Sequence, residues 1–208
     1  ARKESRTNTE PTEAILEALR QSDLLSRVIR KRRQRRGMIS LDLPTSVLEF
    51  DEEGHVSDVH PEDDAFTHTI IEMFMVEANE AVSRLFDGLS ISILRRIHPE
   101  PAMDDLADLR MMAGASGFRV PDDPDRKDLQ KLLDATRGHS ASRAIHFAVL
   151  KTLTKAEYSP AAVGHFALAS DHYAHFTSPI RRYPDLIVHR ALEAWLEQTA
   201  NGTESFGG

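Results

Sequence analysis

The stretch from His172 to Arg190, with the sequence HYAHFTSPIRRYPDLIVHR, constrains the fold more than any other part of the chain. It predicts a helix beginning at Pro179, because Ser178 can cap free amides and proline is favoured in the first helical turn. Pro184 inside that helix would remove one internal hydrogen bond and so kink or restart the helix. Apolar residues spaced by four predict that one side packs into a core, and they are Ile187, Ala191 and Trp195.

The same stretch predicts an anion site at the start of this helix. Free amides at a helix N-terminus carry partial positive charge, and Arg181 and Arg182 add planar, permanently charged guanidinium groups to the first turn. Because arginine forks match the oxygens of phosphate, phosphate is the favoured ligand. The alternative from the residues alone is a capped helix with two solvated arginines on its surface.

The composition is that of an ordinary globular protein. A chain of 208 residues, 40% hydrophobic and 28% charged, is long enough to bury a core as one domain or most of one. The absence of cysteine excludes disulfides and thiolate metal sites and fits a reducing cytoplasm, and no apolar run is long enough to predict a membrane span. The net charge of −7 argues mildly against nucleic acid, but Arg27 to Arg36 and the Arg181–Arg182 pair are locally basic.

The expected elements give an α+β fold class, with a mixed sheet and surrounding helices. Hydrophobic periodicity predicts helices over about 10–35, 65–86, 102–116, 125–136 and 140–155, and strands within 38–59 and over 164–169. The strands over 47–50 and 56–59 should form a hairpin joined by an Asp-Glu-Glu-Gly turn. The helices over 102–116 and 125–136 are predicted to face inward with Leu106, Leu109, Met112, Leu129, Leu132 and Leu133. The first helix should end at Gly37, after the basic run RKRRQRR. Its inward face is predicted from helical spacing, and consists of Ile15, Leu16, Leu19, Leu25, Val28 and Ile29.

The segment HFTSPIRRYPDLIVHR resembles the signature near the end of the catalytic domain of the ribonuclease II and ribonuclease R family. Members of that family are hydrolytic, magnesium-dependent exoribonucleases that degrade RNA from its 3′ end. The resemblance extends over residues 15–197, which correspond to the C-terminal part of that RNB catalytic domain, and leaves 1–14 and 198–208 as tails. It implies a single-stranded RNA 3′ end as partner, release of nucleoside 5′-monophosphates, and no DNA partner.

The resemblance assigns two catalytic roles. Arg181 would stabilise charge on the scissile phosphate. The block IIEMFMVEANEAVS resembles the family pattern IxExxMxxANxxV, whose glutamate contacts the sugar of the 3′-terminal nucleotide, and here that residue is Glu72. A carboxylate can accept hydrogen bonds from both ribose hydroxyls, one of which a deoxyribose lacks. Asn79, two turns later on the same polar line, is a candidate RNA contact; without the resemblance, Glu72 is an ordinary surface glutamate.

Further RNA contacts are implied in and near the signature. Those within the signature are Thr177, Ser178, Pro179, Arg182 and Tyr183. The segment LRRIHPEP resembles the family's RxHxxP strand and turn and makes Arg96 and His98 candidate contacts with the RNA backbone, although a lone histidine can equally be structural. Some relatives stack an aromatic residue of the first hairpin strand on a base; this chain departs from that pattern, with Leu48 at that place and Phe50 on the same face.

The metal-binding part of the family's site is not found. Hydrolysis in the family resembles a two-metal scheme in which Mg²⁺ ions activate water and stabilise the leaving oxygen. The corresponding DxxxxxDDA-like pattern does not occur, and Asp63–Asp64 and Asp122–Asp123 are interpreted as solvated turns. No histidine metal site is expected, because four histidines lack a recognised ligand spacing: His165, His172, His175 and His189. The Mg²⁺ ligands are therefore expected outside this chain, in a missing N-terminal half of the catalytic domain.

Three explanations of the missing motif stay open: a fragment or truncated gene, one chain of a split or processed enzyme, or a descendant that binds RNA without cutting it. The corresponding functions are part of a 3′-to-5′ exoribonuclease that is active only when completed, a noncatalytic RNA-binding module, or a scaffold buried against the missing half. An exposed apolar surface and self-association would favour the scaffold.

Overall fold

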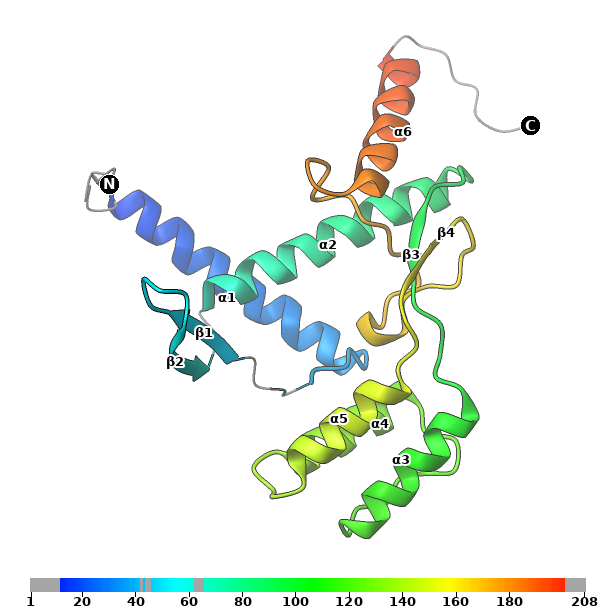
Figure 1. The fold of residues 1–208 in the computed structure, drawn as a ribbon. Coiled ribbons are helices and arrows are strands. Elements are labelled where there is room, and N and C mark those ends of the chain that lie inside the picture. The colour runs from blue at the N-terminus through cyan, green and yellow to red at the C-terminus, as the bar shows by residue number, and fades with distance from the viewer. Residues whose placement is uncertain (1–11, 42, 44–45, 62–65, 201–208) are drawn as a thin grey trace.

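The structure, a computed structural model, describes residues 12–41, 43, 46–61 and 66–200. Two long helices form its centre, where α1 (Glu13–Arg35) packs against α2 (Phe66–Gly88) (Figure 1). A hairpin projects beside them, a group of three helices lies on one side, and the last helix packs near the C-terminal end of α2 (Figure 1). The predicted α+β class is confirmed.

The α1 helix ends where the sequence predicts. Gly37 takes a φ of 92°, a left-handed conformation that glycine adopts without strain, and the Met38 amide donates a hydrogen bond of 3.0 Å to the Arg33 carbonyl. The basic residues of the last turn therefore lie at the negative end of the helix dipole.

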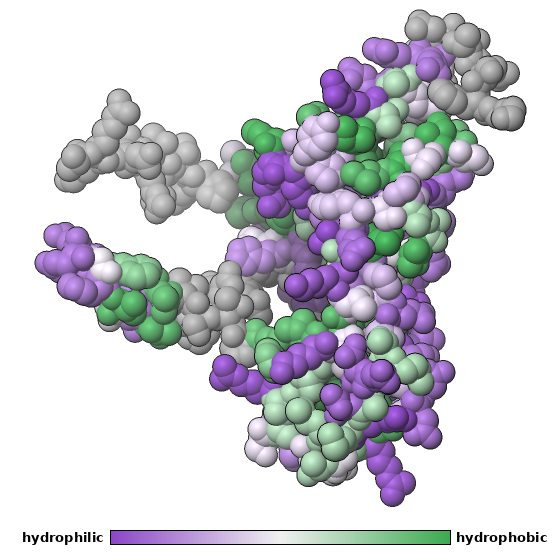
Figure 2. Space-filling view, turned by 45° about the vertical axis from the view of Figure 1, so that its right-hand side comes forward, coloured by the Kyte–Doolittle hydropathy of each residue, from purple (hydrophilic) through white to green (hydrophobic). Residues whose placement is uncertain are grey.

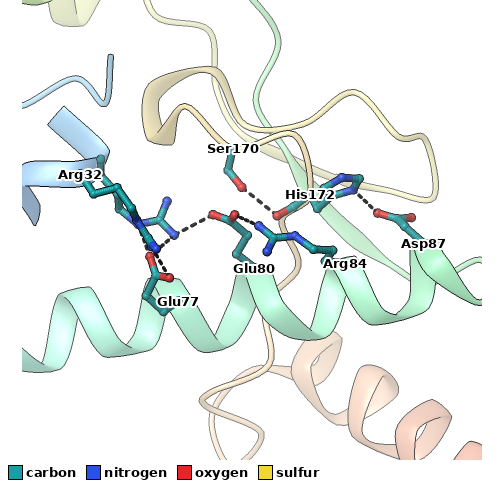
Figure 3. Close-up of polar contacts among 8 residues, drawn as sticks. Arg32, Glu77, Glu80, Arg84, Asp87, Ser170 and His172 are labelled. Atoms are coloured by element: carbon teal, nitrogen blue, oxygen red, sulfur yellow. Dashed lines mark hydrogen bonds and ion pairs between the residues drawn. The ribbon is translucent and has the colours of Figure 1, made fainter. Parts of the chain in front are cut away.

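The apolar face predicted for α1 is mostly exposed, which makes that part of the prediction wrong. Ile29 is buried, but several of the other predicted inward residues are at least 44% exposed: Ile15, Leu19, Leu25 and Val28. Besides the contact of Ile29 with Met73, charged groups hold α1 to α2, since the buried Arg33 forms ion pairs with Glu77 and Glu80. Arg32 pairs with Glu77 as well (Figure 3). Periodicity shows which face of a helix is apolar but not whether another element covers it.

The predicted hairpin with its Asp-Glu-Glu-Gly turn is confirmed. Strand β1 (Ser46–Phe50) pairs antiparallel with β2 (Val56–Pro61), with Leu48 opposite Val59. The Asp51 carboxylate accepts a hydrogen bond of 2.8 Å from the His55 amide and closes the turn. Four apolar side chains of the hairpin are about half exposed: Leu48, Phe50, Val56 and Val59. In Figure 2 they give the projecting hairpin a hydrophobic body behind a hydrophilic turn.

Three helices bury the largest hydrophobic cluster: α3 (Met103–Ala115), α4 (Arg126–Thr136) and α5 (Ser142–Thr152). The predicted inward residues of α3 and α4 are buried, apart from Met112, which is 46% exposed. Asp125 begins α4 with a capping box, in which its carboxylate accepts from the Asp128 amide at 2.8 Å and Asp128 reciprocates. This cap fixes the start of α4 beside the end of α1.

The remaining strands are short. Strand β3 (Arg95–Ile97) pairs antiparallel with β4 (Glu157–Ser159), so the described strands form two separate two-stranded sheets where one mixed sheet was expected. The strand predicted over 164–169 is wrong, because the chain doubles back there through the 3₁₀ turn η1 (Phe166–Leu168). The His165 amide donates to the Ser170 carbonyl at 2.7 Å and closes that turn.

The last helix, α6 (Tyr183–Ala200), begins four residues later than the sequence predicts. Residues 179–181 form a turn in which the Arg182 amide donates to the Ser178 carbonyl at 3.1 Å. Pro184 is therefore the second residue of the helix, where its missing N–H costs no internal hydrogen bond. The predicted kink is unnecessary, and the helix packs through Val188, Ala191 and Leu192.

Candidate functional site

The signature loop, defined here as residues 173–182, is held to α2 by one buried amide. The Asn79 side chain is fully buried, and its Oδ1 accepts hydrogen bonds from the amides of Phe176 at 2.9 Å and Thr177 at 3.2 Å. Its Nδ2 donates to the Tyr173 hydroxyl at 3.1 Å. The amide is thus used inside the protein, so Asn79 positions the loop and does not face solvent as an RNA contact would.

A buried carboxylate holds the second half of the signature loop. The Asp185 side chain is fully buried and its Oδ1 accepts from the Ser178 amide at 2.8 Å and from Nη2 of Arg182 at 2.6 Å. Arg182 is therefore an internal ion-pair partner. The sequence interpretation missed Asp185, although an aspartate three residues after an arginine at a helix start is a recognisable signal.

The tip of the signature loop is presented to solvent. Ile180 is 98% exposed and Tyr183 is 68% exposed. Arg181 is exposed as well, and within the described residues its guanidinium has no hydrogen-bond or ion-pair partner. Of the two adjacent arginines predicted to bind an anion, the structure leaves only Arg181 free to do so. The order along the chain is the reason, since Arg182 is the one spaced to reach Asp185.

Glu72 lies on the same side of α2 as the residue that holds the signature loop. It is exposed and precedes Asn79 by seven residues, which places the two side chains within about 20° of each other around the helix and about 10 Å apart along it. The described residues around Glu72 provide no ion-pair partner. Glu72 on α2 and Arg181 on the signature loop therefore each expose a charged group that pairs with no described residue, and Asn79 connects the helix to the loop.

Of the two candidate contacts at β3, Arg96 bonds to the signature loop through its backbone, whereas the side chain of His98 contacts the segment around Ala167. The Arg96 amide donates to the Tyr173 carbonyl at 3.0 Å, and its guanidinium lies 4.7 Å from the Tyr158 ring centre. His98 is buried, with Nε2 placed 2.7 Å from the Thr154 carbonyl and Nδ1 accepting from the Ala167 amide. The structural alternative for His98 therefore fits its surroundings, whereas the stacked guanidinium of Arg96 is half-buried.

Histidines near the signature loop are kept uncharged. Burial lowers the pKa of His165 to about 3 and the pKa of His175 to about 4, and it is also the largest cause of the lowered pKa of His98. The rings form a line, with 4.8 Å between the His98 and His165 centres and 5.2 Å between His165 and Tyr173. Neutral imidazoles carry no positive charge, so the positive charge at this loop comes from arginine.

One group of potential metal ligands lies in the hairpin turn, where single ligand atoms of Asp51, Glu53 and His55 lie within 4.8 Å of one another. It fits Mg²⁺ poorly, because this ion prefers six oxygen ligands and the group includes an imidazole. The turn also uses Asp51, whose Oδ1 accepts from the amides of Glu53 and His55. Figure 1 places the hairpin beside the N-terminal end of α2, whereas the signature loop is bound at Asn79, in the middle of that helix.

Within the described part of the chain, no helix combines the length and the apolar content that crossing a bilayer requires.

Comparisons with known proteins agree with the sequence signature. The family model for the RNB domain matches residues 2–198. Ribonuclease R of Aquifex aeolicus is 38% identical over 181 residues, which cover 86% of this chain and 26% of that protein. Ribonuclease R of Escherichia coli is 32% identical over 189 residues, covering 88% and 23%. The chain thus spans about a quarter of the length of these relatives.

Solved structures match the fold over nearly the whole chain. Ribonuclease R of Mycoplasma genitalium in complex with ribose-methylated single-stranded RNA has a TM-score of 0.85 and 30% identity, covering 95% of this chain and 31% of that one. Yeast Ssd1, a pseudonuclease, has a TM-score of 0.58 at 24% identity over 70% of this chain and 18% of its own, which shows a similar fold alone. The chain belongs to the RNB domain family of ribonucleases.

Proposed function

We propose that this chain holds the 3′ end of single-stranded RNA as part of a hydrolytic 3′-to-5′ exoribonuclease that releases nucleoside 5′-monophosphates. The observation that carries the proposal is the exposed guanidinium of Arg181, which pairs with no described residue and lies on a loop fixed by buried groups of α2 and α6. An anion-binding group on a fixed support loses little freedom when its ligand binds. Complexes of the Mycoplasma genitalium relative with single-stranded and double-stranded RNA support RNA as the partner.

Two residues would carry the recognition of the terminal nucleotide. Arg181 would donate a pair of hydrogen bonds to the scissile phosphate, where its charge offsets negative charge that develops during hydrolysis. Glu72 would accept hydrogen bonds from the hydroxyls of the terminal ribose and so favour RNA over DNA.

Other signature residues would shape and extend this contact. Thr177, Ser178 and Pro179 set the turn that presents Arg181, and the exposed ring of Tyr183 offers a face on which a base can stack. Arg182 and Asn79 are proposed to act indirectly, through the support of the loop, and His98 through the segment around Ala167 that precedes it.

Hydrolysis by RNB ribonucleases is expected to need divalent metal, which would activate water and stabilise the leaving oxygen. The described residues contain no carboxylate group suited to Mg²⁺, so we propose that the ligands belong to polypeptide that the longer relatives have and this chain does not span. No step is assigned to the residues of the hairpin turn.

A noncatalytic RNA-binding module is the second candidate. The poor fit of the hairpin turn to Mg²⁺ favours it. It predicts salt-dependent binding of single strands without release of nucleotides.

The two candidates are separated by analysing products. The complete protein that contains this chain is incubated with Mg²⁺ and a 5′-labelled oligoribonucleotide. Stepwise shortening from the 3′ end with release of nucleoside 5′-monophosphates is the result expected for the exoribonuclease. Binding without shortening in Mg²⁺ or Mn²⁺ supports the noncatalytic module, and neither binding nor shortening contradicts both.

A further inference from the structure

Two pairs of cationic residues from distant parts of the chain line one pocket. Arg35 and Arg36 come from the end of α1, and Arg126 and Lys127 from the first turn of α4. The pocket has a volume of about 560 Å³ and reaches the loop that begins at Ala169. Its other charged and titratable lining residues are Glu80, Arg84, Asp171 and His172.

A close approach of two helix ends brings these cations together. Gly37 follows Arg36 with a φ of 92°, and a Cβ atom placed on it would lie 3.3 Å from Cγ of Lys127 and 3.4 Å from Cβ of Arg126. A larger residue would be strained by its φ and would also push the start of α4 away. The glycine therefore lets the end of α1 and the start of α4 touch, with cationic side chains on both.

The four cations lack compensating carboxylates. Among the described residues none of Arg35, Arg36 and Lys127 has a polar side-chain partner, and the Arg126 guanidinium has only the Phe166 ring and a long contact with the Phe166 carbonyl.

The carboxylates that line the pocket neutralise little of the charge of these four cations. Glu80 is nearly buried and already pairs with Arg33 and Arg84, as Figure 3 shows for its contact with Arg84. Asp171 is exposed to solvent. His172 is hydrogen-bonded to Asp87, with 2.5 Å between Nδ1 and Oδ2.

This arrangement favours a bound anion. The negative end of the α1 dipole stabilises Arg35, and the capping carboxylates of Asp125 and Asp128 lie beside the first turn of α4. Cations gathered at close range still repel one another, and the start of α4 is the positive end of its helix dipole. In a chain with a net charge of −7, such a pocket is not a by-product of a basic composition. Three of the four cations, Arg35, Arg36 and Arg126, carry guanidinium groups. Guanidinium groups match the geometry of phosphate oxygens.

We propose that this pocket binds backbone phosphates of an RNA strand, at a site separate from the signature loop. The proposal rests on the proposed function, because it takes RNA as the source of the phosphates. The separation follows from α2: Arg84 at the pocket and Asn79 at the signature loop lie about 140° apart around that helix. In Figure 3, α6 lies across α2 from the side that carries Glu80 and Arg84.

The test measures RNA binding by this chain with the pocket charges removed. A double variant, Arg36→Gln with Lys127→Gln, keeps the aliphatic stems and removes two charges. The matched control is Arg119→Gln with Arg143→Gln, which removes two charges from exposed residues of the three-helix group that have no polar partner among the described residues. Fluorescence anisotropy with a labelled twelve-nucleotide poly(A) strand gives Kd at several salt concentrations, and circular dichroism checks the fold.

The expected result is a weaker salt dependence for the pocket variant. Loss of two phosphate contacts lowers the slope of log K against log salt by about 1.4, since each contact to a single strand contributes about 0.7. The control keeps the wild-type slope, and the charge-retaining variant Arg36→Lys with Lys127→Arg binds like wild type. The same loss is expected with a DNA strand, because phosphate contacts do not involve the 2′-hydroxyl.

Three results would overturn the proposal. They are equal slopes for the pocket variant and its control, no binding of the strand by wild type at low salt, and binding of an acidic peptide but not of the strand. Failure of the proposed function gives a different pattern: Arg181→Ala leaves RNA binding and hydrolysis unchanged, while the pocket variant still loses its salt slope.

Discussion

Asn79 Oδ1 accepts a hydrogen bond of 3.2 Å from the Thr177 amide, across 98 positions of sequence. This bond and its neighbour to the Phe176 amide join the helix that carries Glu72 to the loop that carries Arg181. Glu72 and Arg181 are therefore fixed relative to each other through the backbone that carries them, and the structure shows no direct contact between their side chains. The relationship makes Asn79 a positioning residue, and its role can be separated from that of residues exposed to a ligand.

Replacing Asn79 with alanine is expected to destabilise the chain by roughly 3 kcal/mol, because two partly buried amides and the Tyr173 hydroxyl lose their partner. Urea unfolding followed by circular dichroism measures this. Ser83→Ala, one turn later on the same helix, is the matched control. The Ser83 hydroxyl is buried and has no hydrogen-bond partner among the described residues, so its removal should cost less than about 0.5 kcal/mol. Equal losses for both variants would contradict the role given to Asn79.

The two adjacent arginines should differ sharply in their effect on stability. Arg182→Ala leaves the buried Asp185 carboxylate without its cationic partner and is expected to lower the free energy of unfolding by about 3–5 kcal/mol. Arg181→Ala removes an exposed side chain that pairs with none of the described residues, and should change the free energy of unfolding by less than about 0.5 kcal/mol. Thermal and urea unfolding of both variants decide the matter. A stable Arg182 variant would show that the ion pair contributes little.

Local signals in the sequence were sufficient where one or two residues determine the backbone. Gly37 ended α1 as predicted, and the turn after Phe50 closed the hairpin as predicted, because both depend on conformations available to few residues. The start of α6 could not be predicted in this way. Ser178 and Pro179 have the right composition for a helix start, but the long-range contacts of Asp185 and Asn79 hold them in a turn that precedes the helix.

The sequence predicted which residues belong to the candidate site, but not which of their side chains are buried. Arg181, Arg182 and Asn79 all belong to the region identified from sequence, yet of these three only Arg181 is exposed and unpaired within the part of the chain that the structure describes. Which of two neighbouring arginines faces solvent depends on a buried carboxylate whose position only the fold reveals. The basic pocket between α1 and α4 was likewise invisible, because its two halves are about ninety residues apart in sequence.

Stability should fall as the pH decreases below about 6.5. The pKa of His165 is about 3 and that of His175 about 4 in the folded chain, whereas unfolded histidine titrates near 6.5. Between these values the unfolded state binds more protons, so acid favours unfolding by up to about 1.4 kcal/mol per pH unit for each histidine. His165→Phe should make the pH dependence shallower between pH 4 and 6, and His68→Phe, on an exposed residue, should leave it unchanged. Identical slopes for wild type and His165→Phe would refute this account.

Glu72 is expected to set the preference for a terminal ribose. In the complete protein, Glu72→Ala should weaken binding of an oligoribonucleotide roughly tenfold, the loss of about 1.4 kcal/mol of charge-assisted hydrogen bonding. Binding of the same strand with a 3′-terminal deoxyribose should change less, because that sugar lacks one donor. Anisotropy titrations in Ca²⁺, chosen to suppress cleavage, provide the comparison. Glu77→Gln is unsuitable as a control because Glu77 holds α1, so the exposed Glu193→Ala serves instead.

The most direct measurement is the rate at which the complete protein shortens an oligoribonucleotide in Mg²⁺ with Arg181 replaced. Arg181→Ala should lower the rate by about 10²–10³, as expected for loss of a donor to developing negative charge, and Arg181→Lys should restore part of it. Arg190→Ala, on an exposed arginine of α6, should retain the wild-type rate. An Arg181→Ala protein that is folded and shortens RNA at the wild-type rate would contradict the assignment of this guanidinium to the scissile phosphate.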